Sequence, residues 1–253
     1  MSRRGTLFGV GVGPGDPELV TVKAARVLSA SRVVGYFAKR GKSGNAFATS
    51  QPYLHPEAEL LPLFYPYTVE LSPRHPDYVA AMRGFYDASA AQVAARLDRG
   101  LDVAVLCEGD PMFYGSYMYL HDRLAGTHHC KVIPGITSFA GCAASAGIAL
   151  VSTDLVFSIV PATLPEAALE EKLRGAEAAA IIKLGRNFAK VRRVLTRLGR
   201  LAGATYFERG TTDAEVVMPL VDKTDDDAIY FALIIVPGHH GGPYRPLPEG
   251  EGA

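Results

Sequence analysis

The stretch TLFGVGVGPGDP, residues 6–17, determines how the fold begins. Thr6 to Val12 alternate with apolar and β-branched character, which is typical of a strand. Apolar residues at mixed helical spacing follow within residues 18–29, and glycines fill every second position from 9 to 15 between the two patterns. Glycine allows the backbone to turn sharply and to approach a ligand closely. The order predicts a strand, a glycine-rich turn and a helix.

The glycine spacing excludes two common nucleotide-binding motifs. The dinucleotide fingerprint needs a third glycine where this chain has Pro14, Asp16 or Glu18, depending on the frame. The turn is not directly followed by Gly-Lys-Ser/Thr, which a Walker P-loop requires. A structural interpretation also fits, with Asp16 as the helix cap and Pro17 at the first helical position. The turn by itself leaves a ligand site and a purely structural role open.

The rest of the chain continues the alternation of strands and helices, and it restarts after Ile148. Residues 102–107 are almost continuously apolar, as in parallel strands that are covered on both faces. We expect further strands at 32–37, 102–107, 131–133, 155–160, 178–184, 205–208 and 229–236. We expect further helices at 76–99, 137–147, 166–174 and 187–199. On the longest helix the inward residues are Val79, Met82, Phe85, Val93 and Leu97.

These patterns predict an α/β fold of two domains with mostly parallel or mixed sheets. We place an N-terminal α/β domain at residues 1–150 and a C-terminal α/β domain at residues 151–236. Residues 237–253 are dense in glycine and proline, which favours a flexible tail.

Composition narrows the class of protein. Equal numbers of basic and acidic side chains, 26 each, argue against a protein that mainly coats nucleic acid. No stretch approaches about 18 consecutive apolar residues, and no signal peptide is visible, so we expect a cytoplasmic protein without a membrane span. The three cysteines stand in apolar segments without a CxxC pair, which indicates buried thiols in a reducing compartment.

Two further loops follow predicted strands at the edge where open α/β sheets bind ligands. EGDPMFYGS, residues 108–116, comes directly after the strand at 102–107. PGITS, residues 134–138, follows the next strand and offers hydroxyls and free amides at a helix start. With residues 9–17, three loops converge on one rim.

In order and spacing, these three loops resemble those of the tetrapyrrole (corrin/porphyrin) methylase family. The likeness covers roughly residues 6–236. Residues 108–116, YFAKRG at 36–41 with GNA at 44–46, and YPYT at 65–68 with Glu70 are similar to the branch that methylates C-20 of precorrin-2. The combination is specific, whereas each piece alone is not.

The resemblance implies an α/β fold with the active site in the cleft between the two domains, and methyl transfer from S-adenosylmethionine as the chemistry. It implies C-20 methylation of precorrin-2 to precorrin-3A in cobalamin (vitamin B12) biosynthesis, by a homodimer. The implied donor contacts are Pro14, Glu108, Gly109, Asp110, Phe113, Thr137, Ser138, Leu184 and Ala232. The last two stand in KLG, residues 183–185, and FAL, residues 231–233, which are similar to family strand ends.

The chemistry needs positioning more than acid or base catalysis. The sulfonium donor is already activated, so the barrier falls mainly when carbon, methyl and sulfur are held in line. Asp110 fits either a ribose contact or a structural cap. No single base stands out; His121, Tyr114 and Glu70 are candidates for removing the proton.

A carboxylate-rich ring calls for basic side chains in the site. Lys39, Arg40 and Lys42 follow the second strand at the ligand edge, and Arg83 and Arg209 are weaker candidates. Together with Tyr36 and Tyr114, the first three form the expected substrate-binding set. We expect no protein-bound metal, because adjacent residues in the run 128–130 (HHC) alternate sides in a strand.

Other functions remain as alternatives. The same reaction on cobalt-precorrin-2, or methylation of uroporphyrinogen III, a later corrin intermediate, diphthine or ribosomal RNA, would use the same fold. RNA is disfavoured by the neutral charge and by the lack of a basic, aromatic strand face. A non-catalytic tetrapyrrole carrier would have lost donor binding, and a nicotinamide-dependent oxidoreductase is weakened by the failed fingerprint. No axial ligand for cobalt stands out, which favours the metal-free ring.

Overall fold

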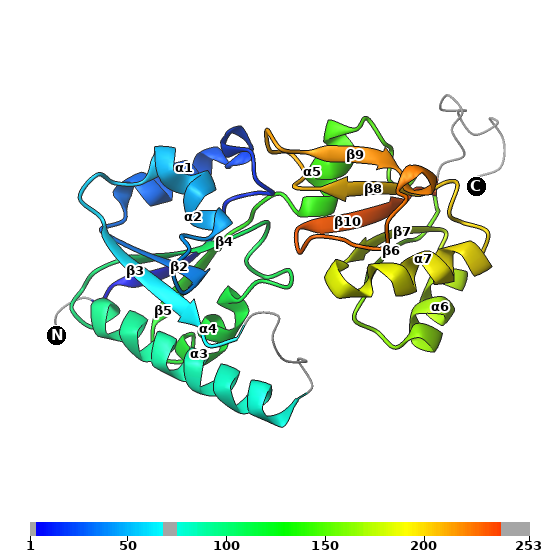
Figure 1. The fold of residues 1–253 in the computed structure, drawn as a ribbon. Coiled ribbons are helices and arrows are strands. Elements are labelled where there is room, and N and C mark those ends of the chain that lie inside the picture. The colour runs from blue at the N-terminus through cyan, green and yellow to red at the C-terminus, as the bar shows by residue number, and fades with distance from the viewer. Residues whose placement is uncertain (1–3, 68–74, 239–253) are drawn as a thin grey trace, which may run out of the picture. The chain divides into compact units, whose positions relative to one another are not determined.

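The computed structural model describes residues 4–67 and 75–238, and it divides into two compact units between Gly141 and Cys142 (Figure 1). Each unit has its own five-stranded sheet with helices packed on it. The two-domain α/β fold class is therefore confirmed. The expected boundary near residue 150 lies a little farther along the chain than this division. Nearly all of the expected tail, residues 237–253, lies outside the described residues.

The first sheet is wholly parallel, with strand order β3-β2-β4-β1-β5. Its strands are β1 (Thr6–Gly11), β2 (Val33–Lys39), β3 (Glu59–Tyr65), β4 (Val103–Cys107) and β5 (His129–Ile133). The helices of this unit are α1 (Val22–Ala30), α2 (Asn45–Ser50), α3 (Pro76–Leu97) and α4 (Tyr117–Leu124), and the division between the units falls within α5 (Ser138–Ser145). Because all five strands run the same way, their carboxyl ends share one edge.

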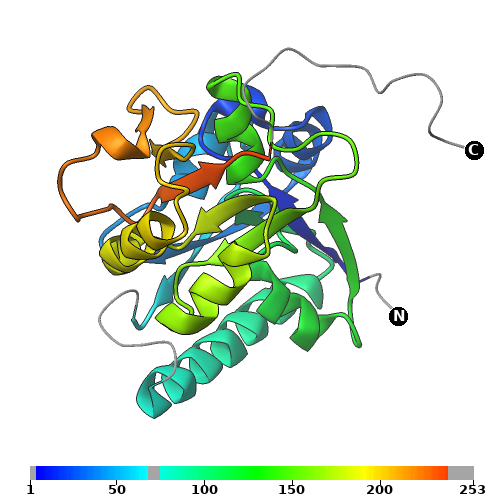
Figure 2. The same ribbon diagram turned by 90° about the vertical axis from the view of Figure 1, so that its right-hand side faces the viewer.

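Helices cover both faces of this sheet. α1 and α2 pack on one face, whereas α3 and α4 pack on the other (Figures 1 and 2). Every residue of β4 is buried, which confirms the interpretation of its continuous apolar run.

The second sheet is mixed, with strand order β6-β7-β10-β8-β9. Its strands are β6 (Phe157–Pro161), β7 (Ala178–Ile182), β8 (Thr205–Glu208), β9 (Val216–Pro219) and β10 (Ala232–Val236). β6 and β7 are parallel, and β10 runs antiparallel to both of its neighbours. α6 (Glu166–Arg174) and α7 (Phe188–Arg197) share one core with the sheet.

Several local expectations needed correction. The helix expected at residues 18–29 is a 3-10 turn, Pro17–Leu19, followed by α1, because the Thr21 side chain accepts from the Ala24 N–H and starts a new helix. Three other short 3-10 turns are Gln51–Tyr53, Gly185–Asn187 and Leu220–Asp222. The elements that the patterns missed are α2, β3, α4 and β9.

The inward face of α3 was predicted only in part. Val93 and Leu97 are buried, and Met82 and Phe85 are partly buried, but Val79 is 47% exposed. The buried residues of α3 begin at Tyr86, so the first turns lie beyond the stretch that packs on the sheet.

The three cysteines are free thiols. Cys107 and Cys142 are buried, which confirms the prediction for them, and burial raises the pKa of each to about 12. Cys130 is only partly buried. Within the described residues, no helix is long and apolar enough to cross a membrane.

A glycine in β1 makes room for a buried tyrosine of α4. A Cβ on Gly9 would overlap the ring of Tyr117, which is fully buried. The missing side chain therefore lets α4 pack close to the centre of the sheet, directly after the loop at residues 108–116.

We predict that Gly9→Ala lowers the free energy of unfolding by about 1–3 kcal/mol, since the new methyl group overpacks the core. Gly84→Ala on α3, where nothing lies within 4 Å of the added Cβ, should instead raise it by up to about 1 kcal/mol. Urea unfolding of both variants would test this, and equal effects would contradict the assigned packing.

Candidate active site

Two loops at the ligand edge of the first sheet are joined through their backbones. The N–H of Gly109 donates to the carbonyl of Gly13 at 2.8 Å, and the N–H of Val12 donates to the carbonyl of Cys107 at 2.9 Å. These bonds continue the pairing of β1 with β4 beyond the ends of both strands. The loops after β1 and β4 therefore lie side by side, as their strand ends predicted.

The third loop joins through glycine contacts. A Cβ on Gly135 would overlap the carbonyl oxygen of Gly109 and would lie 2.8 Å from the Cα of Gly11. A Cβ on Gly11 would in turn lie 2.7 Å from the Cα of Gly135. Only glycine allows three backbones to approach this closely. We call these three residues the glycine junction; it confirms that the three loops meet at one rim.

Asp110 braces the glycine junction. Its Oδ1 accepts from the Met112 N–H at 2.8 Å, and its Oδ2 accepts from the Gly135 N–H at 3.1 Å. One carboxylate thus shapes its own loop and ties it to the loop after β5. The capping role weighed for Asp110 is present, while its expected donor contact stays a prediction.

Glu108 stands beside this junction, at the end of β4. The backbone N–H groups of Asn45 and Ala46, in the first turn of α2, donate to its carboxylate. Loss of hydration raises the pKa of Glu108 to about 7, and the two N–H groups act against this shift by stabilising the charged form. Part of the residue's surface is exposed, so the neighbouring atoms that raise the pKa surround the carboxylate without covering it completely.

The other residues of the first unit that were predicted to contact S-adenosylmethionine lie in the same three loops or at the start of α5. Phe113 packs edge-on against Tyr114 and Phe139, with ring centroids 4.9 and 5.8 Å apart. Ser138 begins α5 and is exposed, and Thr137, directly before it, is partly buried; the first N–H groups of a helix have no partner within the helix itself. Pro14 is partly buried in the first loop, where Asp16 caps the turn at Pro17, as the structural interpretation predicted.

In the second unit, Leu184 and Ala232 lie at one edge of the sheet. β10 runs antiparallel to β7, so the start of β10 lies next to the end of β7. The side chain of Leu184 is fully buried in the core, so only its backbone can face a ligand. Lys183 and Arg209 adopt left-handed backbone at φ 60° and 47°, a conformation that concentrates at functional sites.

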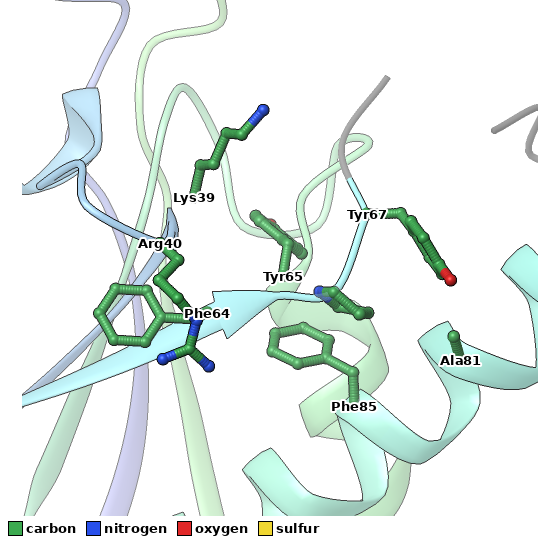
Figure 3. Close-up of a pocket in the computed structure, with 8 residues that line it drawn as sticks. Lys39, Arg40, Phe64, Tyr65, Tyr67, Ala81 and Phe85 are labelled. Atoms are coloured by element: carbon green, nitrogen blue, oxygen red, sulfur yellow. The ribbon is translucent and has the colours of Figure 1, made fainter. Parts of the chain in front are cut away.

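A pocket of about 570 Å³ opens next to the joined loops, over the ends of β2 and β3 (Figure 3). This size lies within the usual range of small-molecule sites, about 300–1,000 Å³. Lys39 and Arg40 supply positive charge, and the walls are mostly aromatic. The lining residues are Lys39, Arg40, Phe64, Tyr65, Pro66, Tyr67, Ala81 and Phe85. We call this hollow the cationic-aromatic pocket.

The two basic residues reach in different directions. The Arg40 guanidinium lies 5.4 Å from the ring centroid of Phe64, whereas the Lys39 ammonium points away from it (Figure 3). The aromatic ring holds Arg40 by a cation–π contact and leaves its N–H groups to face an anion. The pocket therefore suits a ligand with an apolar body and separated carboxylates.

Only some of the residues that were predicted to bind the substrate line this pocket. Tyr36 does not line the pocket; its ring packs in the core next to α1 and α2, with its centroid 4.6 Å from that of Phe47. Lys42 is exposed and does not line the pocket. Tyr114 is 48% exposed at a left-handed φ of 54°, in the loop after β4. Arg83 is exposed on α3.

The proton-accepting base is not singled out. The hydroxyl of Tyr117 lies 3.4 Å from Nδ1 of His121, which places His121 along α4 beside a buried ring. Glu70 and Thr68 lie outside the described residues. Among the residues that the structure covers, no three His, Cys, Asp or Glu side chains gather as metal ligands would.

Sequence reasoning missed the aromatic wall of the pocket because it missed β3. The apolar and aromatic run from Leu60 to Tyr65 carried a strand signal, but Pro62 weakened it. Phe85 was expected to be a core residue, and it lines the pocket because α3 passes the end of β3. No sequence signal indicated the raised pKa of Glu108, because the shift depends on the atoms that the fold brings around its carboxylate.

Two α/β units with glycine-joined loops at one sheet edge define the class, and the chain belongs to the tetrapyrrole (corrin/porphyrin) methylases, whose family model matches residues 6–222. A precorrin-2 C(20)-methyltransferase from Sinorhizobium sp. is 51% identical over 234 residues, which cover 92% of this chain and 96% of that protein. The cobalt-precorrin-2 C(20)-methyltransferase of Salmonella typhimurium is 27% identical over 92% of this chain and 96% of that protein.

Solved structures agree on the fold. A cobalt precorrin-4 methyltransferase superposes with a TM-score of 0.66 at 22% identity, over 92% of this chain and 94% of that one. A uroporphyrin-III C-methyltransferase from Thermus thermophilus, in complex with S-adenosylhomocysteine, gives 0.62 at 23% identity, over 92% of each chain.

We predict that Asp110→Asn lowers the free energy of unfolding by about 1 kcal/mol, because an amide cannot accept from both Met112 and Gly135. Asp122→Asn, an equal change at an exposed position of α4, should have little effect. Denaturant unfolding measures both, and a stable Asp110→Asn variant would show that the brace is dispensable.

Proposed function

We propose that this protein transfers a methyl group from S-adenosylmethionine to C-20 of precorrin-2, giving precorrin-3A in cobalamin biosynthesis. The observation that carries this proposal is the 51% identity to the Sinorhizobium enzyme along nearly the whole of both chains. The geometry supports it, since the joined loops and a cationic-aromatic pocket share one edge of the first sheet.

The donor would bind at the joined loops. Amides and hydroxyls at Thr137 and Ser138 suit a ligand with many polar groups, and Phe113 offers an apolar surface. The sulfonium supplies an activated methyl group, so the protein contributes mainly by holding its partners in place. The proposed contacts remain Pro14, Glu108, Gly109, Asp110, Phe113, Thr137, Ser138, Leu184 and Ala232.

The tetrapyrrole would engage the cationic-aromatic pocket. Its ionised carboxylates match Lys39 and Arg40, and part of its ring system can pack on the aromatic wall. The order of strands places this pocket over β3 and β2, next to β4, β1 and β5 with their joined loops. A substrate in the pocket would thus lie near a donor on the same rim. Lys42, Tyr36 and Tyr114 remain weaker proposals for substrate contact.

The metal-free ring is favoured over its cobalt complex. The relative that acts on precorrin-2 by name is 51% identical, whereas the cobalt-precorrin-2 relative is 27% identical. Uroporphyrinogen III is the next candidate. The expected homodimer, the cytoplasmic location and the absence of a protein-bound metal stay predictions.

Anaerobic incubation with S-adenosylmethionine and either precorrin-2 or cobalt-precorrin-2 tests the function. We expect one added methyl by mass spectrometry, at C-20 by carbon NMR, and a faster reaction with the metal-free ring. Methylation of uroporphyrinogen III alone, or donor binding without transfer to any ring, would overturn the proposal.

We predict that Arg40→Ala raises KM for precorrin-2 about tenfold with kcat little changed, because a contact to a carboxylate contributes to binding throughout the reaction. Arg174→Ala, which removes an exposed ion pair with Glu170 on α6, is the matched control and should leave both constants unchanged. Steady-state kinetics at low and high salt measure this effect; an unchanged KM in Arg40→Ala would remove Arg40 from the site.

A further inference from the structure

Ser116 stands at the start of α4 but does not cap that helix. Serine at an N-cap position usually accepts a hydrogen bond from the second or third helical N–H. Here the N-cap side chain makes no such bond. The hydroxyl is therefore directed to other partners, and those partners indicate a different role.

The partners are two tyrosines from two other elements. The hydroxyls of Tyr65 and Ser116 lie 2.6 Å apart, and either can donate. The hydroxyl of Tyr86, on α3, donates to the Ser116 Oγ at 3.1 Å. One serine thus links the end of β3 and the middle of α3 to the end of the loop after β4.

The Tyr65 ring is also held by packing. It stacks on Phe37 with centroids 5.6 Å apart and an interplanar angle of 18°, and it packs against Phe85 at 5.2 Å. Tyr65 and Phe85 both line the cationic-aromatic pocket. Figure 3 shows the rings of Tyr65 and Phe85 in the pocket wall. Stacking on Phe37 and contact with Phe85 fix the Tyr65 ring laterally, and Ser116 anchors its hydroxyl.

We propose that Ser116 is a positioning residue for substrate: its hydroxyl holds Tyr65 in the pocket wall and thereby sets the affinity for the tetrapyrrole. This inference rests on the proposed function, because it assumes that the ring system packs on that wall. Ser116 itself is not a lining residue and acts through Tyr65.

The joined loops, where S-adenosylmethionine would bind, are held by contacts that do not involve Ser116. The Asp110 brace and the glycine junction hold the loop from Gly109 to Met112 without using the Ser116 hydroxyl. Loss of that hydroxyl should therefore weaken tetrapyrrole binding and spare donor binding. Loss of the Asp110 brace should do the opposite.

The test compares two ligands on the full-length protein. We expect Ser116→Ala to raise KM for precorrin-2, and Kd for the stable probe uroporphyrin III, about tenfold. Kd for S-adenosylhomocysteine should stay within about twofold. Asp110→Asn should weaken S-adenosylhomocysteine more than it weakens uroporphyrin III. Fluorescence quenching gives the porphyrin affinity and calorimetry gives the donor-site affinity.

A double-mutant cycle tests whether Ser116 acts on substrate binding through Tyr65. Tyr65→Phe keeps the ring and removes the hydroxyl, so it should match Ser116→Ala, and the double variant should be no worse than either. Ser116→Thr restores the hydroxyl and should recover most of the affinity. Ser31→Ala is the matched control, because Ser31 is also buried in the first unit and donates to the Val27 carbonyl at 2.8 Å.

Three results would overturn the inference. Equal weakening of both ligands by Ser116→Ala would show a general disturbance of the loop, as would additive effects in the double variant. Reduced stability with unchanged tetrapyrrole affinity would show that the cluster only packs α3 on α4. If the wild-type protein neither methylates precorrin-2 nor binds uroporphyrin III, the proposed function fails first and the inference fails with it.

Discussion

The close approach of three backbone segments at Gly11, Gly109 and Gly135 is the constraint on which the ligand edge depends. A Cβ at Gly11 or Gly135 would meet backbone atoms of the neighbouring loop, which cannot move aside as a flexible side chain could. Parallel strands bring the loops to one edge, but parallel pairing alone does not bring them into contact. Contact comes from the missing side chains, from the backbone bond between Gly109 and Gly13, and from the hydrogen bond that Asp110 accepts from the Gly135 N–H.

The same edge carries two kinds of surface side by side. Over β4, β1 and β5 the loops present backbone groups, hydroxyls and the rings of Phe113 and Tyr114, whereas over β3 and β2 the surface is aromatic with two cations. Such a division suits a reaction between a small polar donor and a large carboxylated ring. The loop after β4 belongs to both surfaces, because it begins at the glycine junction and ends at Ser116, next to the pocket wall.

In the second unit, two residues keep strained backbone at one end of the sheet. Lys183 and Arg209 keep left-handed backbone at the ends of β7 and β8, where an ordinary turn would favour glycine. β10 lies between these two strands, so both residues flank the start of β10, near Ala232. Strain of this kind persists only where the surrounding core enforces it, and Leu184 next to Lys183 is fully buried in that core.

The sequence by itself determined the order of most strands and helices, the two-unit organisation and the meeting of three loops. The spacing of apolar residues and the positions of glycines are local properties of the sequence. The direction of the strands then determines at which edge of the sheet the loops lie. β3 was missed because Pro62 interrupts a strand-like run that tolerates proline at a sheet edge. For the same reason, the aromatic wall of the pocket could not be read from the sequence.

Only the tertiary structure decided which side chains share a site. Tyr36 packs on Phe47 in the core between the sheet and α1 and α2 and does not line the pocket, although it stands three residues before Lys39. Ser116 carries the local signal of a helix cap, yet its hydroxyl bonds to tyrosines that are 51 and 30 residues away in the chain. A hydroxyl has several possible partners of similar strength, and the choice among them depends on which groups the packing of α3, β3 and α4 brings within reach.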